Sequence, residues 1–403
     1  MSLNDVVSAE RLHIGFFGLR NAGKSSLVNA VTGQDLAVVS PVKGTTTDPV
    51  KKAMELLPLG PVVIIDTPGL DDEGELGALR VKKATEILSS IDVAVLVHDA
   101  ALPLSDLEQS LLSSLSERKI PVICAYNKAD LLAEVPEAKE NLLYLSALTG
   151  SGVHELKEAL ADLGRAARLA QRRIVADLLS EGDMVVLVIP IDESAPKGRL
   201  ILPQQQTIRD VLDAHCSVVC CQVEELSRTL GALRAPPAMV ITDSQAFGRV
   251  SRLVPDEIPL TSFSILFARY KGELESLVRG AAKLSALQDG DKVLISEGCT
   301  HHRQCNDIGT VKLPGWIRDY TGKDLTFEFT SGGTFPEDLS PYALVVHCGG
   351  CMLNEKAMAH RMDTARAQGV SMVNYGVAIA CMHGILARSL GLFPAVQAVL
   401  NTP

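Results

Sequence analysis

The stretch Gly18-Leu-Arg-Asn-Ala-Gly-Lys-Ser25 decides the fold of the first part of this chain. It stands between an apolar run, Leu12–Phe17, and a run of helix-forming residues, which is the setting of a phosphate-binding loop. The glycines of such a loop let backbone N–H groups curl around phosphate, Lys24 supplies positive charge, and the Ser25 hydroxyl can bind Mg²⁺. A chance match in an arbitrary loop is the alternative. We reject it because further nucleotide-binding motifs follow in the expected order.

Two of these motifs come directly after apolar runs that are typical of buried strands. The first, Asp66-Thr-Pro-Gly69, is expected to place a carboxylate near the metal and the Gly69 amide near the terminal phosphate. The second is Asn127-Lys-Ala-Asp130. There a carboxylate can accept hydrogen bonds from the N1 and 2-amino groups of guanine, which adenine does not offer. We therefore expect Asn127 and Asp130 to select guanine.

Two shorter motifs complete the site. Ser146-Ala-Leu148 follows a fourth strand-like run and can direct a backbone N–H to the guanine carbonyl. Gly44-Thr-Thr-Thr-Asp48 lies where a threonine closes on Mg²⁺, and we favour Thr46 over its two threonine neighbours. Together the motifs predict binding of GTP with Mg²⁺. The residues expected to contact the nucleotide or its ions are Gly18, Asn21, Ala22, Gly23, Lys24, Ser25, Ser26, Thr46, Asp66, Gly69, Asn127, Lys128, Asp130, Ser146 and Ala147.

These motifs resemble those of Ras-type GTPases of the translation-factor class, particularly the tRNA-modification GTPase and Era families. Leu70 stands where Ras-type enzymes place a water-orienting glutamine, so the resemblance implies slow hydrolysis. Asn21 matches an asparagine that coordinates K⁺ in potassium-activated relatives; a turn residue that tolerates unusual backbone angles is the alternative. We expect a slow, K⁺-stimulated GTPase in which Lys24, Asn21 and Thr46 promote hydrolysis. No side chain in the motifs is an obvious general base.

Composition limits the class of protein. With 403 residues, 47% of them hydrophobic and 21% charged, the chain is long enough for two or three globular domains. Its formal net charge of −10 gives no electrostatic help in binding nucleic acid or acidic membranes. No uncharged apolar run approaches the length of a membrane span. Nine cysteines, an odd number, with no secretory leader in Met1–Arg11, predict a reducing cytoplasm.

The pattern of apolar runs predicts three α/β domains, because strand-like and helical segments alternate along the chain. We place a Ras-like GTP-binding domain at residues 8–168 and two further α/β domains at 172–268 and 271–403. The predicted strands are Leu12–Phe17, Val62–Asp66, Val93–Asp99, Pro121–Asn127, Met184–Pro190, Ala238–Thr242, Lys292–Ser296, Leu325–Thr330, Tyr342–Val346 and Ser371–Tyr375. The predicted helical stretches are Gly77–Ser90, Leu104–Arg118, His154–Leu179 with a linker in its middle, Thr207–Ala214 and Cys221–Leu233.

A second site is indicated near the C-terminus by Cys299-Thr-His301 and His347-Cys348-Gly-Gly-Cys351. Each segment follows a predicted strand, and if those strands are parallel their carboxyl ends meet at one edge of a sheet. Three thiolates are one short of a closed cage, so a metal or cluster bound here keeps an exchangeable position. A structural zinc site of three Cys and one His is the main alternative. A redox pair is less favoured because no thioredoxin-like surround is evident.

The two cysteine segments behind a GTPase resemble the HydF family, the maturation GTPases of FeFe-hydrogenase. Further matching stretches are Gly44–Val50, Asp71–Leu76, Leu202–Asp210 and Val346–Asn354. The resemblance implies a 4Fe–4S cluster held by Cys299, Cys348 and Cys351. His301 and His347 are then the nearest candidates for its fourth position, and donors to sulfur or packed residues are the alternative for each.

The same resemblance implies that the middle domain mediates homodimerisation. It also implies a scaffold or carrier on which the diiron subcluster of FeFe-hydrogenase is completed. Radical-SAM maturases would deliver components, and the apo-hydrogenase would receive the product. Two rival functions remain: a zinc-stabilised regulatory GTPase, and a tRNA- or ribosome-acting GTPase. For Cys216, Cys220 and Cys221, which stand in an apolar setting, we expect core packing.

Overall fold

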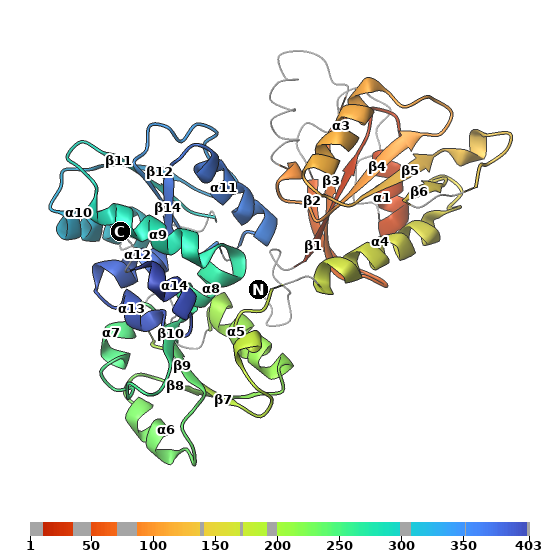
Figure 1. The fold of residues 1–403 in the computed structure, drawn as a ribbon. Helices are drawn as coiled ribbons and strands as arrows, with labels where there is room; N and C mark the ends of the chain where they lie inside the picture. The colour runs from red at the N-terminus through yellow and green to blue at the C-terminus, as the bar shows by residue number, and fades with distance from the viewer. Residues whose placement is uncertain are drawn as a thin grey trace. The chain divides into compact units, whose positions relative to one another are not determined.

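The computed structural model describes residues 11–34, 50–70, 87–137, 141–169, 172–191, 200–298, 308–350 and 352–400. The chain divides into two compact units, Met1–Gln171 and Arg172–Pro403 (Figure 1). Both units consist of helices packed on sheets, so the predicted α/β class is confirmed.

The first unit is built on a six-stranded sheet with the order β2-β3-β1-β4-β5-β6. β2 runs antiparallel to β3, and the other neighbours are parallel. The strands are β1 (Leu12–Phe17), β2 (Val50–Leu56), β3 (Gly60–Asp66), β4 (Val93–Asp99), β5 (Val122–Asn127) and β6 (Leu142–Tyr144). The helical segments of this unit, within the described residues, are α1 (Lys24–Thr32), α3 (Asp106–Glu117), the 3₁₀ turn Ala129–Leu131 and α4 (Val153–Leu169).

Helices cover both faces of this sheet, as the sequence predicts. Val62 and Ile64 of β3 pack with α1 and α4 in one apolar cluster. Val63 and Ile65, the alternate residues, pack with α3 in another. Successive side chains of a strand point to opposite faces, so a strand buried on both faces is apolar throughout. This explains why the buried central strands of this unit are easy to recognise in the sequence, whereas the edge strand β2, with Lys51, Lys52 and Glu55 exposed, was not predicted.

Two predictions for the first unit need comment. Most of the predicted helix Gly77–Ser90 lies outside the described residues. The predicted helical stretch His154–Leu179 is too long, because α4 ends at Leu169 and Ala176–Leu178 forms a 3₁₀ turn that belongs to the second unit.

The second unit contains two four-stranded sheets, ordered β10-β9-β7-β8 and β12-β11-β13-β14. All paired strands in them are parallel. The first sheet comprises β7 (Met184–Val188), β8 (Ser217–Cys221), β9 (Met239–Thr242) and β10 (Leu260–Ser262). The second comprises β11 (Lys292–Ser296), β12 (Thr326–Thr330), β13 (Leu344–His347) and β14 (Ser371–Asn374).

The prediction of a helix over Cys221–Leu233 is wrong at its start, because Cys221 ends β8 and α6 begins only at Leu226. β8 is an edge strand of five residues with exposed residues at Ser217 and Cys220, and an apolar run this short does not distinguish a strand from a helix. Cys216 is buried, as expected, but Cys220 is exposed and core packing is wrong for it.

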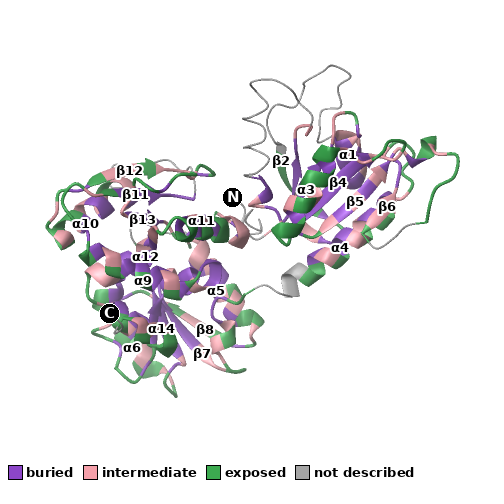
Figure 2. Cartoon of the chain, turned by 45° about the horizontal axis from the view of Figure 1, so that its top comes forward, coloured by how far each residue is buried: buried purple, intermediate pink, exposed green. Residues whose placement is uncertain are grey.

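One apolar cluster joins the two sheets of the second unit through the helices between them. Gly280 on α9 shows how close this packing is, because a Cβ there would lie 1.9 Å from the Met372 carbonyl oxygen of β14. In Figure 2 buried residues follow the strands and exposed residues follow the outer faces of the helices. The helices are α5 (Leu202–Asp213), α6 (Leu226–Ala232), α7 (Phe247–Val250), α8 (Phe263–Lys271), α9 (Leu274–Ser285), α10 (Leu313–Thr321), α11 (Glu355–Ala367), α12 (Tyr375–Met382), α13 (Leu386–Ser389) and α14 (Pro394–Val399), with a π-helical turn at Ile308–Lys312.

The parallel strands bring the predicted motifs to the carboxyl edges of the sheets, where open α/β sheets bind ligands. In the first unit β1, β3 and β5 end at the phosphate loop, at Asp66 and at Asn127. In the second unit the ends of β11 and β13 are neighbours, with Ser296 opposite His347. The condition that these strands be parallel is therefore met.

Candidate functional site

The phosphate loop connects β1 to α1 through backbone angles that glycine adopts easily. Gly18 has φ 153° and Gly23 has φ 87°. A Cβ at Gly18 would lie 2.1 Å from the Val97 carbonyl oxygen, and one at Gly23 would lie 2.2 Å from Asn127 Nδ2. These glycines are required because both the conformation and the space exclude a side chain. Asn21 also has a positive φ, 60°, which asparagine tolerates.

Lys24 closes the phosphate loop on itself. Its Nζ donates hydrogen bonds to the carbonyl oxygens of Gly18 at 2.9 Å and Leu19 at 2.8 Å, and the residue is 8% exposed. We expect Lys24 to exchange these carbonyl oxygens for phosphate oxygens when nucleotide binds, because an ammonium group binds a negatively charged oxygen more strongly than a neutral one.

Ser25 and Asp66 form an oxygen-rich pair beside this lysine. Ser25 Oγ donates to Asp66 Oδ2 at 2.9 Å, and the other oxygen, Oδ1, is buried with no hydrogen-bond partner among the described residues. Burial raises the pKa of Asp66, although the Ser25 hydrogen bond and the charge of Lys24 oppose the rise. A hydroxyl and an unsatisfied carboxylate oxygen are ligands that Mg²⁺ prefers, so the pair fits this ion. Ser25 and Asp66 would hold the ion, and its positive charge would offset the negative charge of the nucleotide phosphates.

The segment after Asp66 is tied to the same loop. Thr67 Oγ1 donates to the Phe16 carbonyl oxygen at 2.7 Å, and the Leu70 amide donates to the Gly18 carbonyl oxygen at 3.2 Å. These bonds hold Gly69 next to the phosphate loop, where its amide is expected to face the terminal phosphate.

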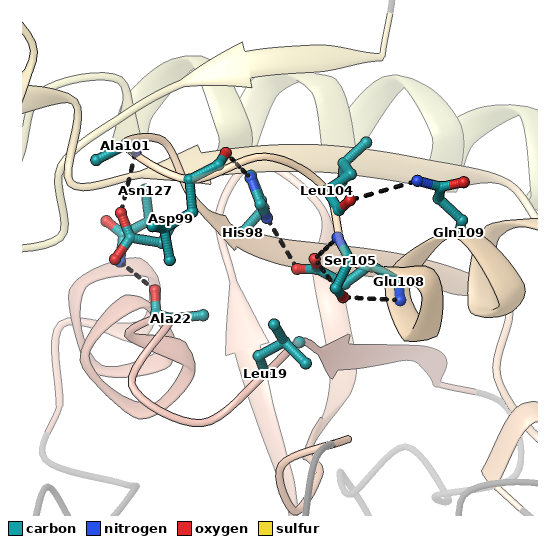
Figure 3. A network of polar contacts seen from close by, with 12 residues as sticks. Leu19, Ala22, His98, Asp99, Ala101, Leu104, Ser105, Glu108, Gln109 and Asn127 are labelled. Atoms are coloured by element: carbon teal, nitrogen blue, oxygen red, sulfur yellow. Dashed lines mark hydrogen bonds and ion pairs between the residues drawn. The ribbon is translucent and has the colours of Figure 1, made fainter.

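Asn127 connects three parts of the nucleotide site (Figure 3). Its Nδ2 donates to the Ala22 carbonyl oxygen at 2.9 Å, and its Oδ1 accepts from the Ala147 amide at 2.9 Å. The side chain thus links the phosphate loop, the end of β5 and the segment after β6. Ser146 is buried there, while Asp130 is exposed at the edge of the site. We infer that Asn127 positions the loops, and that Asp130 remains the residue placed to contact a base.

Lys128 is held by a carboxylate that sequence reasoning did not include. Its Nζ lies 2.6 Å from Asp99 Oδ2 at the end of β4. Burial tends to raise the pKa of Asp99, but hydrogen bonds from Lys128 and the Ala101 amide outweigh it and lower the pKa. The neighbouring residue, His98, makes a buried contact of 2.8 Å from Nδ1 to Glu108 Oε1 (Figure 3).

A local sequence signal exists for the second of these contacts. Ser105-Asp-Leu-Glu108 has the spacing of a capping box, and the structure forms it at the start of α3. No local signal predicts the pairing with His98, because the contact depends on how α3 packs against β4.

The described nucleotide-site residues therefore gather at one sheet edge. They are Gly18, Asn21, Ala22, Gly23, Lys24, Ser25, Ser26, Asp66, Gly69, Asn127, Lys128, Asp130, Ser146 and Ala147. Thr46, the expected Mg²⁺ and catalytic threonine, lies outside the described residues.

In the second unit, Cys348 follows β13 directly and its sulfur is surrounded by backbone donors. Cys348 Sγ accepts hydrogen bonds from the Gly298 amide at 3.0 Å and the Gly350 amide at 3.4 Å. N–H donors of this kind stabilise the thiolate form, which is the form that binds iron or zinc. Gly298 is the residue before Cys299, so the described residues bring the chain next to Cys299 against Cys348. Cys299, His301 and Cys351 themselves lie outside the described residues.

His347 is completely buried, and both of its ring nitrogens have partners. Nδ1 lies 2.7 Å from the Cys348 carbonyl oxygen, and Nε2 lies 2.8 Å from Arg361 Nη1. A guanidinium group only donates, so Nε2 accepts and Nδ1 carries the proton. Burial, assisted by the charge of Arg361, lowers the pKa of His347 to about 3. The arrangement favours one of the alternatives stated for this histidine, a packed residue, over a fourth ligand.

Two negative findings apply to the described part of the chain. It contains no group of three or more His, Cys, Asp or Glu side chains placed to hold a metal ion. No helix in it is long and apolar enough to cross a bilayer.

Comparison with known families divides the chain into three consecutive segments. Residues 13–128 match the 50S ribosome-binding GTPase family, 174–272 match the hydrogen maturase F dimerization domain, and 275–392 match the hydrogen maturase F tetramerization domain. The first segment is thus a GTPase domain. The other two segments match domains that are named after dimerization and tetramerization.

Individual relatives match the GTPase part. The tRNA modification GTPase MnmE of Legionella pneumophila (strain Corby) is 39% identical over 159 residues, which cover 38% of this chain and 35% of the relative. The corresponding protein of Bordetella petrii is 34% identical over 159 residues, 39% of this chain and 35% of the relative. The chain therefore spans about a third of the length of these curated relatives.

Among solved structures, that of Era from Aquifex aeolicus aligns with a TM-score of 0.35 and 21% identity, over 60% of this chain and 97% of that chain. The two hydrogen maturase F matches follow the GTPase match along the sequence, at residues 174–272 and 275–392. They confirm the family resemblance drawn from the cysteine motifs. Because these matches are consecutive, together span more than half of the chain and follow a GTPase domain, this chain belongs to the hydrogen maturase F family of hydrogenase maturation GTPases.

Proposed function

We propose that this protein is a GTP-hydrolysing scaffold that carries a 4Fe–4S cluster, completes the diiron subcluster of FeFe-hydrogenase and delivers it to the apo-enzyme. Radical-SAM maturases supply the components, and the protein works as a homodimer in the cytoplasm. The observation that supports the proposal is that the amide of Gly298, the residue before Cys299, donates to Cys348 Sγ.

In the nucleotide site, Lys24 and the loop amides hold the phosphates, and Ser25, Asp66 and Thr46 hold Mg²⁺. Asp130 selects guanine, and Asn127 keeps the loops in place for it. Hydrolysis is slow because Leu70 cannot orient water, and K⁺ held by Asn21 supplies part of the missing positive charge. The orphaned oxygen of Asp66 and the closed Lys24 loop support this assignment.

In the cysteine site, Cys299, Cys348 and Cys351 hold three irons of the cluster. With only three cysteines in the motif, such a cluster would keep one position for an exchangeable ligand, which would suit a diiron cargo. His301 is the remaining histidine candidate for this position, because the nitrogens of His347 already bond to Arg361 and to the Cys348 carbonyl.

The test is anaerobic reconstitution of the full chain with iron and sulfide, followed by absorbance and EPR spectroscopy. We expect a brown protein with about four irons per chain and the spectrum of a reduced cubane. The variant Cys348→Ser should lose most of this iron, and Cys220→Ser, an exposed cysteine off the motif, should lose none. A colourless protein that holds one zinc would replace the proposal with the zinc-stabilised regulatory GTPase.

One observation favours the other rival, a tRNA- or ribosome-acting GTPase: the relatives matched by the first unit are tRNA modification GTPases. The net charge of −10 argues against it, because neutralising phosphates requires a basic surface. A binding titration with tRNA and ribosomal RNA at low salt decides between them. Lys24→Ala, tested in the transfer of the assembled subcluster to apo-hydrogenase, then shows whether GTP binding is needed for delivery.

A further inference from the structure

The turn that carries Cys348 is held by a buried lysine from a different module. Lys271 is the last residue of α8 and is 5% exposed. Its Nζ donates to the carbonyl oxygens of Gly350 at 3.0 Å and Leu353 at 2.8 Å. Lys271 lies in the segment matched to the dimerization domain, while the turn lies in the segment matched to the tetramerization domain. One module thus reaches into the cysteine site of the next.

A second buried cation contacts the residue that precedes Cys348. Arg361 of α11 is 3% exposed. Its guanidinium donates to His347 Nε2 at 2.8 Å and the Gly332 carbonyl oxygen at 2.7 Å, and lies 5.0 Å from the centre of the Phe335 ring. These partners are all neutral. They satisfy the hydrogen bonds of the guanidinium but do not cancel its charge.

Buried positive charge needs a counter-charge, because removing an ion from water costs several kcal/mol in proteins. A cluster bound at Cys348 would place negative charge near both residues. A 4Fe–4S core held by three thiolates is an anion, and it gains a further negative charge when it is reduced by one electron. The net charge around a cluster is one of the factors that set its reduction potential.

We propose that Lys271 and Arg361 are positioning residues that hold the segments on either side of Cys348, through Gly350 and Leu353 and through His347, and offset the negative charge of the cluster, and so raise its reduction potential. The inference rests on the proposed function, since it requires a cluster at this site. It adds a role for the dimerization module, which contributes Lys271 to cluster binding.

The test uses the full chain with Lys271→Met and Arg361→Met, which remove charge but keep an apolar stem. Each variant is reconstituted anaerobically, and its reduction is followed by EPR at controlled potentials. The reduced cluster bears more negative charge, so it loses more from the missing cation than the oxidised one. We expect the ratio of reduced to oxidised cluster at a fixed potential to fall about tenfold, which is 59 mV for a one-electron couple.

Control variants separate charge from damage to the fold. Lys292→Met removes the same charge from the first residue of β11, an exposed position at the strand end opposite to the cysteine site. It should leave the potential unchanged. Lys271→Arg and Arg361→Lys keep the charge and should stay near the wild-type potential. If a methionine variant is insoluble, Lys271→Gln or Arg361→Gln, polar but uncharged, decides the same point.

The outcomes distinguish this inference from the function on which it rests. If the wild type takes up no iron and sulfide, the scaffold function and the inference both fail. If the wild type carries a cluster and the uncharged variants keep its potential, only the charge-compensating role of Lys271 and Arg361 is overturned. A shift of equal size in the charge-conserving variants overturns it as well, because geometry rather than charge would then be responsible.

Discussion

Asn127 joins three segments of the nucleotide site, so its removal should loosen all three. Its two hydrogen bonds, to the Ala22 carbonyl and from the Ala147 amide, are both 2.9 Å long, and the residue is 2% exposed. Asn127→Ala deletes both bonds. Each contributes about 0.5–1.5 kcal/mol, and a buried polar group left without its partner costs about 1–3 kcal/mol. We therefore expect the free energy of local opening to fall by about 2–4 kcal/mol.

Hydrogen exchange of the full chain, read by mass spectrometry, measures this loss where it occurs. A tenfold change corresponds to about 1.4 kcal/mol, so amides in the loop before α1 and in the segment after β6 should exchange roughly 30 to 700 times faster. Peptides of the second unit should be unchanged. The affinity for a fluorescent GDP analogue should fall at least about tenfold, because the same segments bind phosphate and base.

Two variants make the prediction selective. Asn127→Asp keeps an acceptor for the Ala147 amide but sets a carboxylate oxygen against the Ala22 carbonyl, so its loss should exceed that of Asn127→Ala. Asp130→Ala alters an exposed side chain and should leave exchange almost unchanged while it weakens the preference for guanine over adenine nucleotides. The reasoning is refuted if Asn127→Ala exchanges like the wild type, or if Asp130→Ala loosens the loops as much.

Gly280→Ala would set a Cβ 1.9 Å from a backbone oxygen, so the second unit should lose about 1–3 kcal/mol or more in thermal unfolding, while Gly315→Ala on α10, with open space around it, should lose nothing. Equal melting of the two variants would contradict the packing. The hydrogen bond to Glu328 raises the pKa of Tyr342 from 10.0 to about 12. The hydrogen bond therefore stabilises the fold fully below pH 10, and this stabilisation is lost as the pH rises towards 12. The free energy of unfolding measured in urea should show this decline for the wild type, and Tyr342→Phe should lack it. A variant that keeps the wild-type slope would disprove the link. Asn21→Gly keeps the positive φ but removes the side-chain oxygen, so hydrolysis should be faster in KCl than in NaCl for the wild type only; equal wild-type rates would rule out a K⁺ site.

The sequence predicts this site well where function depends on the ends of central strands. A parallel strand buried on both faces is a continuous apolar run, so its end is visible, and the motif at Asp66 or at Asn127 stands out after it. The same reasoning predicted that Cys348 lies near the residues before Cys299, because β11 and β13 are parallel and end side by side. The edge strand β8 shows where this fails, because its apolar run, Val218–Cys221, is too short to distinguish a strand from a helix by its pattern.

Contacts between distant elements were beyond local reasoning for a different physical reason. The motif suggested His347 as a ligand because histidine often binds metal, but its nitrogens are engaged by Arg361 and by a carbonyl. Nothing near His347 in the sequence indicates that a guanidinium from α11 will be buried against it. Lys271 is similar, because it ends a helix in one module and acts on a turn in another.

Lys24 and Lys271 show that the two sites use one physical device. Each is a buried lysine at the end of a helix, and each donates to two carbonyl oxygens of a glycine-containing turn that follows a parallel strand. The bonds to carbonyl oxygens hold each turn in shape, and the positive charge of the ammonium group favours an anion in the site. Lys24 belongs to the loop that it holds, and it can turn to a phosphate as nucleotide arrives and departs. Lys271 reaches its turn from another module, and we expect its charge to stay in place whether or not the site is filled. A fixed cation suits a group that is retained through many reactions, and a movable one suits a ligand that is exchanged in each cycle.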